Sequence, residues 1–157
     1  MKYVNECVVF QEIPDEISLA INISNCPCRC PGCHSKYLWN DIGNELTHSE
    51  LDEMLSKYLG EITCVVFMGG DAYINDINDL AMYMRNIYPS IKIGWYSGRT
   101  VISNLLNKEL FNYIKIGPYI KHLGPLNKKT TNQRIYRKIS NSEWEDITYK
   151  FWKSQPE

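Results

Sequence analysis

The chain has 157 residues, of which 44% are hydrophobic and 22% charged, and its formal net charge is −1. This length fits one domain with a real core, and no apolar run approaches the roughly 18 residues of a membrane span. The first residues lack the basic start and long apolar core of a signal peptide, and the charge implies no attraction to nucleic acid or membranes. We therefore expect a cytoplasmic protein in a reducing setting, where clustered cysteines favour metal binding over disulfides.

The first part of the chain predicts one strand followed by a cysteine-rich loop. Residues 17–24 alternate between apolar and small or polar side chains, as in a half-buried strand. A short apolar run at residues 8–10 precedes this strand, and residues 35–39 can form a helical turn after the loop. The loop therefore begins where the strand ends.

Two amphipathic helices are expected next. Thr47 and Glu50 form a capping box that opens the first helix, and Gly60 ends it. Its apolar face comprises Leu51, Met54, Leu55, Tyr58 and Leu59. The second helix spans about residues 75–88, and its buried stripe comprises Ile77, Leu80, Ala81, Met84 and Ile87.

Further strands are expected at residues 62–68, 91–96 and 113–116. The uninterrupted apolar run at 62–68 indicates a strand covered on both faces. We also expect a short helix near residues 101–107 and a last helix within residues 142–152.

Strands that alternate with helices predict an α/β fold with a largely parallel sheet. Only four or five strands can be counted. A closed eight-unit barrel needs about 200–250 residues, so we expect an incomplete barrel that is open along one side. In such folds functional loops gather at the carboxyl ends of the strands. The loops expected there are the cysteine loop, Gly69-Gly70-Asp71, Ser97-Gly98 and Gly117-Pro118-Tyr119.

Four of the six cysteines lie within eight residues, at Cys26, Cys28, Cys30 and Cys33. The other two, Cys7 and Cys64, are isolated and are expected to be ordinary buried small residues. Four thiolates could hold a structural zinc, but zinc sites usually pair two separated C-x2-4-C knuckles. The spacing C-x3-C-x2-C suits three corners of a [4Fe–4S] cluster whose fourth iron stays open to a ligand. We favour the iron–sulfur cluster over zinc.

Cys28 lies inside this motif without belonging to its spacing. It could be a bystander, a fourth ligand in a resting state or a redox liability. Simultaneous ligation by Cys26, Cys28 and Cys30, with one residue between neighbours, would strain the backbone. We therefore prefer the bystander interpretation.

Two further loops carry candidate binding residues. Gly69 and Gly70 allow the backbone to approach a ligand with unpaired groups, and Asp71 supplies a carboxylate for an ammonium. The alternative is that this loop only caps the following helix. Ser97 could hydrogen-bond a ligand carboxylate or ribose, or could merely start a turn.

Several other residues have open interpretations. The aromatic residues favour core or site-wall positions, namely Tyr37, Trp39, Trp95 and Tyr96. His34 is more suited to contribute its backbone to a cofactor pocket than to bind metal. From Tyr113 to Lys138 there are seven bases and no acid. This segment is either a solvated basic loop or a docking surface for an acidic protein or anionic group.

These residues together resemble the radical S-adenosylmethionine (SAM) superfamily. Its markers are C-x3-C-x2-C after the first strand and a Gly-Gly-Glu-like motif after the second, here Gly69-Gly70-Asp71. Within it, the chain is similar to the activating proteins of anaerobic ribonucleoside-triphosphate reductases. That similarity rests on the small size, the Cys-Pro-Gly-Cys ending of the motif, Gly-Gly-Asp, Gly117-Pro118-Tyr119 and Asn132-Gln133-Arg134, over about residues 15–138.

The resemblance implies a glycyl-radical activating enzyme. A [4Fe–4S] cluster would chelate SAM and cleave it reductively, and the 5′-deoxyadenosyl radical would abstract hydrogen from a backbone glycine of the reductase. Cys26, Cys30 and Cys33 would bind the cluster, Gly32 to His34 would line the adenine side, and Gly69 to Asp71 the methionine side. No side-chain acid or base is required. An electron donor such as a flavodoxin is implied, with no nucleic acid or membrane partner.

The resemblance also implies one radical SAM domain over residues 1–157, with about 120–157 as a C-terminal extension. Cys28 departs from the motif, and many relatives carry an aromatic residue where Gly32 stands, so adenine packing must come from elsewhere. The open barrel suits a large substrate such as a protein loop. The alternatives are a non-catalytic zinc or Fe–S interaction module, and radical chemistry on another glycyl-radical enzyme or a small molecule.

Overall fold

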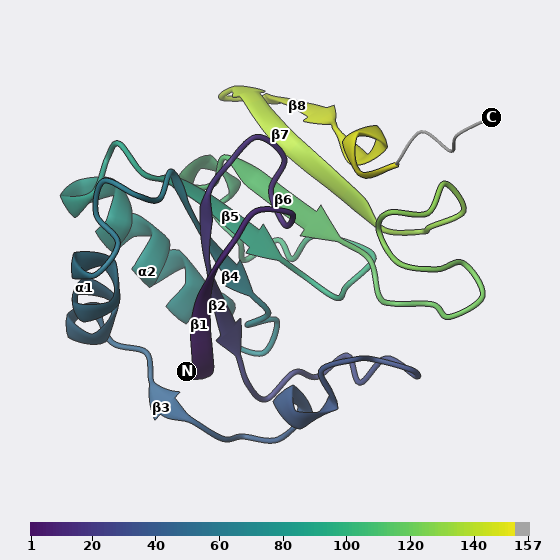
Figure 1. The fold of residues 1–157 in the computed structure, drawn as a ribbon, viewed down its shortest axis with the longest axis horizontal. Coiled ribbons are helices and arrows are strands. Elements are labelled where there is room, and N and C mark those ends of the chain that lie inside the picture. The colour runs from purple at the N-terminus through teal and green to yellow at the C-terminus, as the bar shows by residue number, and fades with distance from the viewer. Residues whose placement is uncertain (153–157) are drawn as a thin grey trace.

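The computed structural model describes residues 1–152, and their strands form one eight-stranded sheet in the order β3-β1-β2-β4-β5-β6-β7-β8 (Figure 1). The central four strands are parallel: β2 (Ser18–Ile23), β4 (Cys64–Met68), β5 (Lys92–Tyr96) and β6 (Tyr113–Ile116). Antiparallel strands extend both sides, namely β1 (Lys2–Val9), β3 (Asn44–Glu45), β7 (Arg134–Ser140) and β8 (Glu143–Asp146). The prediction of an α/β fold with an open partial barrel and a largely parallel sheet is confirmed.

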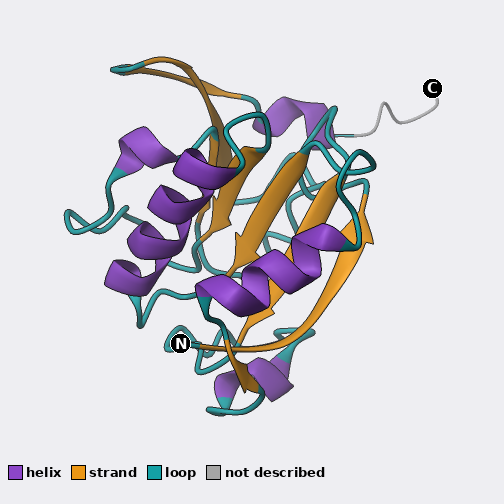
Figure 2. Ribbon diagram, turned by 90° about the vertical axis from the view of Figure 1, so that its left-hand side faces the viewer, coloured by secondary structure: helices purple, strands orange, loops and turns teal. Residues whose placement is uncertain are grey.

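Two helices cover the convex face of the sheet, α1 (His48–Ser56) and α2 (Ile74–Ile87) (Figure 2). Thr47 caps α1, because its Oγ1 accepts a hydrogen bond from the Glu50 amide at 3.1 Å. The large side chains Phe67 and Trp95 point from the strands into this layer and are almost fully buried. Each fully buried side chain of this size stabilises the fold by roughly 1.5–3 kcal/mol.

The concave face is filled at one level and open at the next. Ala20, Val66, Gly94 and Tyr113 face one another across the four parallel strands. Ile13, in the loop after β1, is fully buried against this row, where a Cβ on Gly94 would lie 3.1 Å from the Ile13 Cδ1.

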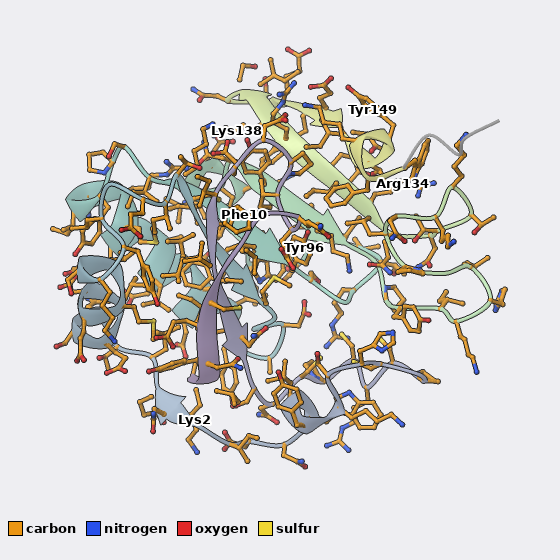
Figure 3. The ribbon with its side chains drawn as sticks, viewed as in Figure 1. Lys2, Phe10, Tyr96, Arg134, Lys138 and Tyr149 are labelled. Carbon is orange, nitrogen blue, oxygen red and sulfur yellow. The ribbon has the colours of Figure 1, made fainter. Side chains whose placement is uncertain are left out.

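The row nearer the carboxyl ends consists of Asn22, Met68, Tyr96 and Lys115. The Tyr96 side chain lies near the middle of the molecule (Figure 3). Its hydroxyl donates a hydrogen bond to the Glu12 carbonyl, which ties the loop after β1 to this row. Above this row the barrel is open, and its carboxyl end is where the cysteine loop lies.

Two predicted helices are wrong. Residues 142–152 form β8 and the 3-10 helix η3 (Thr148–Phe151), because β8 returns on β7 as a hairpin. The Arg137–Glu145 pair, 2.5 Å apart, favours this cross-strand arrangement. Residues 101–107 form turns, because Asn78 of α2 donates to the Leu105 carbonyl and accepts from the Asn107 amide. The short 3-10 helix η2 (Lys108–Leu110) follows.

Four or five strands were expected, and β1, β3 and β8 were not among them. Cys7, predicted to be buried, is exposed on the edge side of the sheet, whereas Cys64 is fully buried as expected. Leu59 and Ile87, predicted on buried helix faces, are both 53% exposed because each lies at or beyond the end of its helix. No helix within residues 1–152 is both long and apolar enough to cross a membrane.

Candidate cofactor site

The cysteine loop leaves β2 at its carboxyl end and is anchored at its base. The Cys26 amide donates to the Leu38 carbonyl at 2.8 Å, and the Asn25 amide donates to the Asn40 carbonyl at 2.9 Å. Leu38 belongs to the 3-10 helix η1 (Lys36–Trp39), so the predicted helical turn after the loop is confirmed. Positive φ angles at Asn25 (58°) and Arg29 (44°) bend the chain sharply between these anchors.

All four cysteines of the loop are half-buried free thiols. The Cys33 amide donates to the Cys30 carbonyl at 3.0 Å, and the Ser35 amide lies 3.3 Å from the Cys33 sulfur. Such N–H···S contacts are among the features that tune iron–sulfur sites.

Asp71 joins the cysteine loop to the end of β5. Its Oδ1 accepts a hydrogen bond from the Ser97 hydroxyl at 2.5 Å, and its Oδ2 accepts one from the Gly98 amide at 2.9 Å. The Cys28 thiol lies 3.7 Å from the same Oδ2. A carboxylate offers about four lone-pair positions, so one acceptor position remains for an ammonium. The predicted gathering of these loops at one end of the sheet is found.

The alternative in which Asp71 caps α2 does not hold, because α2 begins after Tyr73 without a side-chain cap.

The backbone groups of the two glycines are bonded largely to the protein itself. The Gly69 amide donates to the Tyr96 carbonyl, and the Gly69 carbonyl accepts from the Trp95 indole at 2.8 Å. At Gly70, φ is +91° and a Cβ would lie 2.7 Å from the Ile77 side chain, so only glycine fits.

Cys28 packs against the loop after β5 and is not among the residues that line the cavity. A Cβ on Gly98 would lie 2.8 Å from the Cys28 sulfur, so the two loops are in close contact. Burial raises the pKa of the Cys28 thiol to about 12, and the nearby Asp71 carboxylate and Cys26 add to this effect. A thiol that holds its proton is a poor metal ligand. This environment favours the bystander interpretation.

Ser97 is 2% exposed, and both functions of its hydroxyl have protein partners. It donates to Asp71 and accepts from the Arg99 amide at 3.0 Å. It therefore fixes the Asp71 carboxylate and the turn after β5. That Ser97 also contacts a cofactor stays a prediction.

Lys115 is a buried cation next to these acids and thiols. Its ammonium donates to the Gly117 carbonyl at 2.9 Å and lies 5.6 Å from the centre of the Tyr96 ring. Burial lowers the pKa of Lys115 to about 8, and its acidic neighbours, among them the Asp71 carboxylate, oppose that effect only in part. A desolvated ammonium with one neutral oxygen partner is suited to an anionic ligand.

A cavity of about 180 Å³ lies between the cysteine loop and the strand ends, and Cys26, Cys33, Gly69, Asp71, Ser97 and Lys115 are among its lining residues. Trp39 also lines it, and its buried indole N–H has no hydrogen-bond partner within residues 1–152. Pockets for ligands of nucleoside size are typically about 300–1,000 Å³.

The donor set fits a cluster better than a single metal ion. Within residues 1–152, no three cysteine, histidine or acidic side chains are placed to hold one metal ion. A cubane distributes its thiolates over different irons, so its ligands lie farther apart. Trp39, whose indole N–H has no partner within residues 1–152, and Lys115, whose ammonium has one, both line the cavity, which suits the anionic sulfur of a cluster.

The loop after β6 lies against the cysteine loop. The Tyr119 ring is 5.8 Å from the His34 ring, and a Cβ on Gly32 would lie 3.3 Å from Tyr119 Cε1. Gly32 and His34 are both exposed and lie outside the cavity. Of the aromatic residues, Trp39 and Tyr96 line the cavity, Trp95 is in the core, and Tyr37 is 44% exposed.

Among the cavity residues that sequence reasoning missed, two are polar side chains inside strands. Lys115 was counted only as one base of a basic segment, although a lysine inside the apolar strand Tyr-Ile-Lys-Ile was a signal. The sequence marks Asn22 only as part of an alternating strand, although its polar side chain, four residues before Cys26, lines the cavity.

Comparison with known proteins gives the family. A family described as "4Fe-4S single cluster domain" matches residues 17–141, which is more than half of the chain. No curated protein and no solved structure matches this chain. The matched segment contains the cysteine loop, Asp71, Ser97 and Lys115. The chain therefore belongs to the 4Fe-4S single cluster domain family, as a radical SAM-type domain whose cofactors are a [4Fe–4S] cluster and SAM.

Proposed function

We propose that this protein is a glycyl-radical activating enzyme whose substrate is an anaerobic ribonucleoside-triphosphate reductase. The observation that carries the proposal is the Asp71 carboxylate, which binds the end of β5 through Ser97 and Gly98 and contacts the cysteine loop at Cys28. It supports a site in which a cluster-bound ligand is held from two sides.

In this proposal Cys26, Cys30 and Cys33 hold the cluster. Gly69, Gly70 and Asp71 bind the methionine side of SAM, with the remaining acceptor position of Asp71 available to its ammonium. Ser97 positions Asp71. Gly32, Cys33 and His34 contribute the adenine side, where the neighbouring Tyr119 ring supplies an aromatic surface that Gly32 itself lacks.

When bound, the cluster and SAM supply one-electron cleavage of the sulfonium C–S bond, which yields methionine and a 5′-deoxyadenosyl radical able to take one hydrogen atom from a glycine Cα. The chain's own residues bind, orient and exclude water. Lys115 places a positive charge beside thiolates and carboxylates, and Trp39 offers a hydrogen bond inside the cavity.

A protein substrate is supported by the open barrel. The concave face is filled by Ile13 at its lower level, but the row of Asn22, Met68, Tyr96 and Lys115 borders the cavity, and no strand or helix within residues 1–152 closes it. A large partner can cover such an opening and exclude water when it binds.

The electron has to come from a donor protein, and the charge distribution supports an acidic one such as a flavodoxin. Of the seven bases between 113 and 138, Lys115 is buried and three pair with acids, namely Arg134, Arg137 and Lys138. Three remain exposed with no ion pair among the described residues, namely Lys121, Lys128 and Lys129. They lie on the loop that packs on Gly32, and neither this loop (117–133) nor the cysteine loop (25–36) contains an acid.

The test is anaerobic activation. The reconstituted protein should contain about four irons per chain, cleave SAM when reduced, and give a glycyl radical by electron paramagnetic resonance after mixing with the reductase. A colourless zinc protein would overturn the proposal at its first step. SAM cleavage without a glycyl radical on the reductase would support the radical chemistry but would show that the reductase is not the substrate.

A further inference from the structure

The side chains of Asn5 and Asn22 pair on the concave face, at the open edge of the barrel. The Asn22 Nδ2 donates to the Asn5 Oδ1 at 2.7 Å, and the two residues are register partners across β1 and β2. Asn22 also lines the cavity and continues the row formed by Met68, Tyr96 and Lys115. The pair therefore extends this row from the cavity to the exposed strand β1.

A β-bulge creates the pairing. Tyr3 pairs with Ile23, but the register shifts before Asn5, so that Asn5 and not Val4 lies opposite Asn22. Bulges often occur next to active sites, where they re-aim a side chain. Here the bulge turns an amide toward the same face as the cavity, and Asn5 is exposed there.

The pair keeps one carbonyl oxygen and three N–H groups unused. Each amide has two N–H groups and one carbonyl oxygen, and the shared hydrogen bond uses one N–H of Asn22 and the oxygen of Asn5. Within residues 1–152, the oxygen of Asn22 and the amino group of Asn5 form no further hydrogen bond to the protein. A free oxygen beside free N–H groups, without charge, can pair with both the N–H and the carbonyl of a peptide group.

The surface beside the pair leaves room for a main chain. The next residues on this face of β1 and β2 are Cys7 and Ala20, which are register partners and both small. Cys7 is exposed, whereas Ala20 is buried in the same cluster as Ile13, so the open part of this strip is its β1 side. A glycine target has no side chain, so an enzyme that acts on its Cα must hold it through the neighbouring peptide groups.

We propose that the Asn5–Asn22 pair binds a peptide group of the partner's glycine loop and aligns that loop with the cavity. This inference rests on the proposed function and adds the means of recognition: main-chain hydrogen bonds from two neutral amides, beside a strip of small residues. It makes Asn5 a residue for binding the protein substrate, with no part in binding SAM.

The experiment compares two activities of the holoenzyme. One is the rate of glycyl-radical formation on the reductase, and the other is SAM cleavage with dithionite in the absence of the reductase. Asn5→Asp keeps the shape but replaces the donor by an acceptor, and Asn5→Ala removes both. Asn86→Ala, an exposed asparagine on α2 at the opposite face of the sheet, is the matched control.

We expect both Asn5 variants to lower kcat/KM for the reductase about tenfold, the effect of one lost hydrogen bond, with SAM cleavage and iron content equal to wild type. Wild-type activation in both Asn5 variants overturns this proposal alone. An equal fall of both activities also overturns it, because Asn5 would then act through the cofactor. If the wild-type chain gives no glycyl radical, the proposed function fails and this inference fails with it.

Discussion

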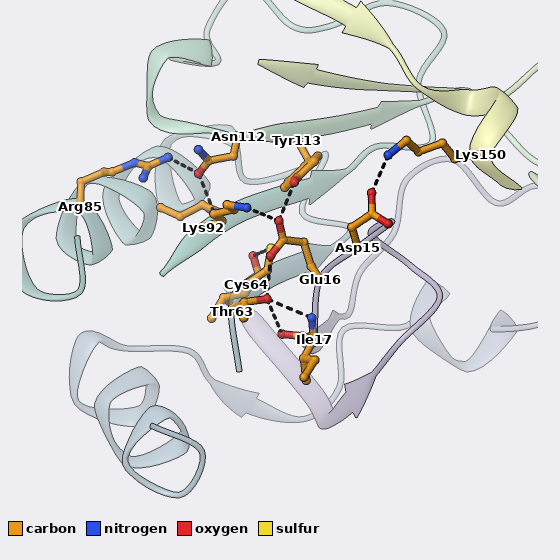
Figure 4. Close-up of polar contacts among 12 residues, drawn as sticks. Asp15, Glu16, Ile17, Thr63, Cys64, Arg85, Lys92, Asn112, Tyr113 and Lys150 are labelled. Atoms are coloured by element: carbon orange, nitrogen blue, oxygen red, sulfur yellow. Dashed lines mark hydrogen bonds and ion pairs between the residues drawn. The ribbon is translucent and has the colours of Figure 1, made fainter. Parts of the chain in front are cut away.

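The two ends of the parallel strands each bury one charged side chain, and the two are treated differently. At the amino end, the Glu16 carboxylate accepts hydrogen bonds from Thr63 and Tyr113, both at 2.6 Å, and from Lys92 (Figure 4). At the carboxyl end, the Lys115 ammonium has one neutral partner, the Gly117 carbonyl.

The pKa values show the consequence. Burial raises the pKa of Glu16, but the hydrogen bonds from Lys92, Thr63 and Tyr113 together outweigh burial and lower it. For Lys115 burial prevails and lowers the pKa to about 8. In both cases burial opposes the charge, and only Glu16 is fully compensated.

The difference separates stability from function. A buried charge with a complete set of partners holds strands together, here the loop before β2, β4, β5 and β6. A buried charge that lacks its counterion lowers stability and is retained where a ligand completes it. The Glu16 end is thus a finished structural network, and we infer that the cofactors complete the Lys115 end.

The largest expected effect comes from removing a cluster ligand at the carboxyl ends of the parallel strands. Cys26→Ala removes one of three thiolates proposed to hold the cluster, so bound iron and SAM cleavage should both be abolished. Iron analysis and product chromatography after anaerobic reconstitution measure this. Cys28→Ala is the matched control in the same loop and should keep the cluster, since its thiol faces Asp71 and Gly98. Equal loss of iron in both variants would make Cys28 a ligand.

The second prediction is that Lys115→Met separates stability from activity. Removing an uncompensated buried charge should stabilise the cofactor-free protein by about 1–3 kcal/mol in urea unfolding. Activity should fall about 10- to 100-fold, as for the loss of a charged hydrogen bond of about 1.5–3 kcal/mol.

The lowered pKa of Lys115 also determines how its contribution to stability changes with pH. Because the pKa of Lys115 is about 8 when folded and near 10.4 when unfolded, the unfolded state binds more protons between these values. Wild-type stability should therefore gain from this group as pH rises from 8 to about 10.4, and Lys115→Met should lack that gain. A destabilised Met variant would contradict the comparison.

Local patterns sufficed for much of the fold. Thr47 and Glu50 placed the start of α1, and the Tyr113–Ile116 strand was predicted with its final bounds. These features depend on a few adjacent residues. The cysteine loop and Asp71 were also placed at the correct end, since all parallel strands end there.

The remainder depends on contacts that are distant in sequence. Asn78 of α2 binds the backbone at 105 and 107 and removes a helix that local propensity favoured. The burial of Lys115 depends on its register with Tyr96, which no local pattern shows. The pairing of Asn5 with Asn22 requires a bulge at Val4 that the sequence does not mark.

A third prediction concerns a variant that disrupts only the Glu16 network at the amino ends of the parallel strands. Glu16→Gln should lower the free energy of unfolding at pH 7 by about 1–3 kcal/mol, because three donors lose a charged acceptor. It should leave KM for SAM unchanged. Asp15→Asn, beside it, removes only an exposed pair with Lys150 and should have little effect on stability.

The stability difference between wild type and Glu16→Gln should depend on pH. A carboxylate whose pKa is lowered by folding stabilises the protein above its unfolded pKa, about 4.3, and loses that contribution as pH falls through the folded value. The difference in stability between wild type and Glu16→Gln should therefore shrink below about pH 4.3. A constant difference down to pH 2 would show that the carboxylate charge is not what matters.

The smallest expected effect concerns the exposed lysines of the 117–133 loop. Lys128→Glu with Lys129→Glu should slow reduction of the cluster by a flavodoxin about threefold to tenfold at low ionic strength, because steering by a few charges acts on association. Above about 0.15 M salt the difference should largely vanish. Lys57→Glu with Lys108→Glu makes the same charge change at exposed sites on and near the helical layer and should have no effect. Dithionite needs no docking surface, so it should reduce both double variants at the wild-type rate, and slow reduction by dithionite would instead locate the defect in the cluster itself.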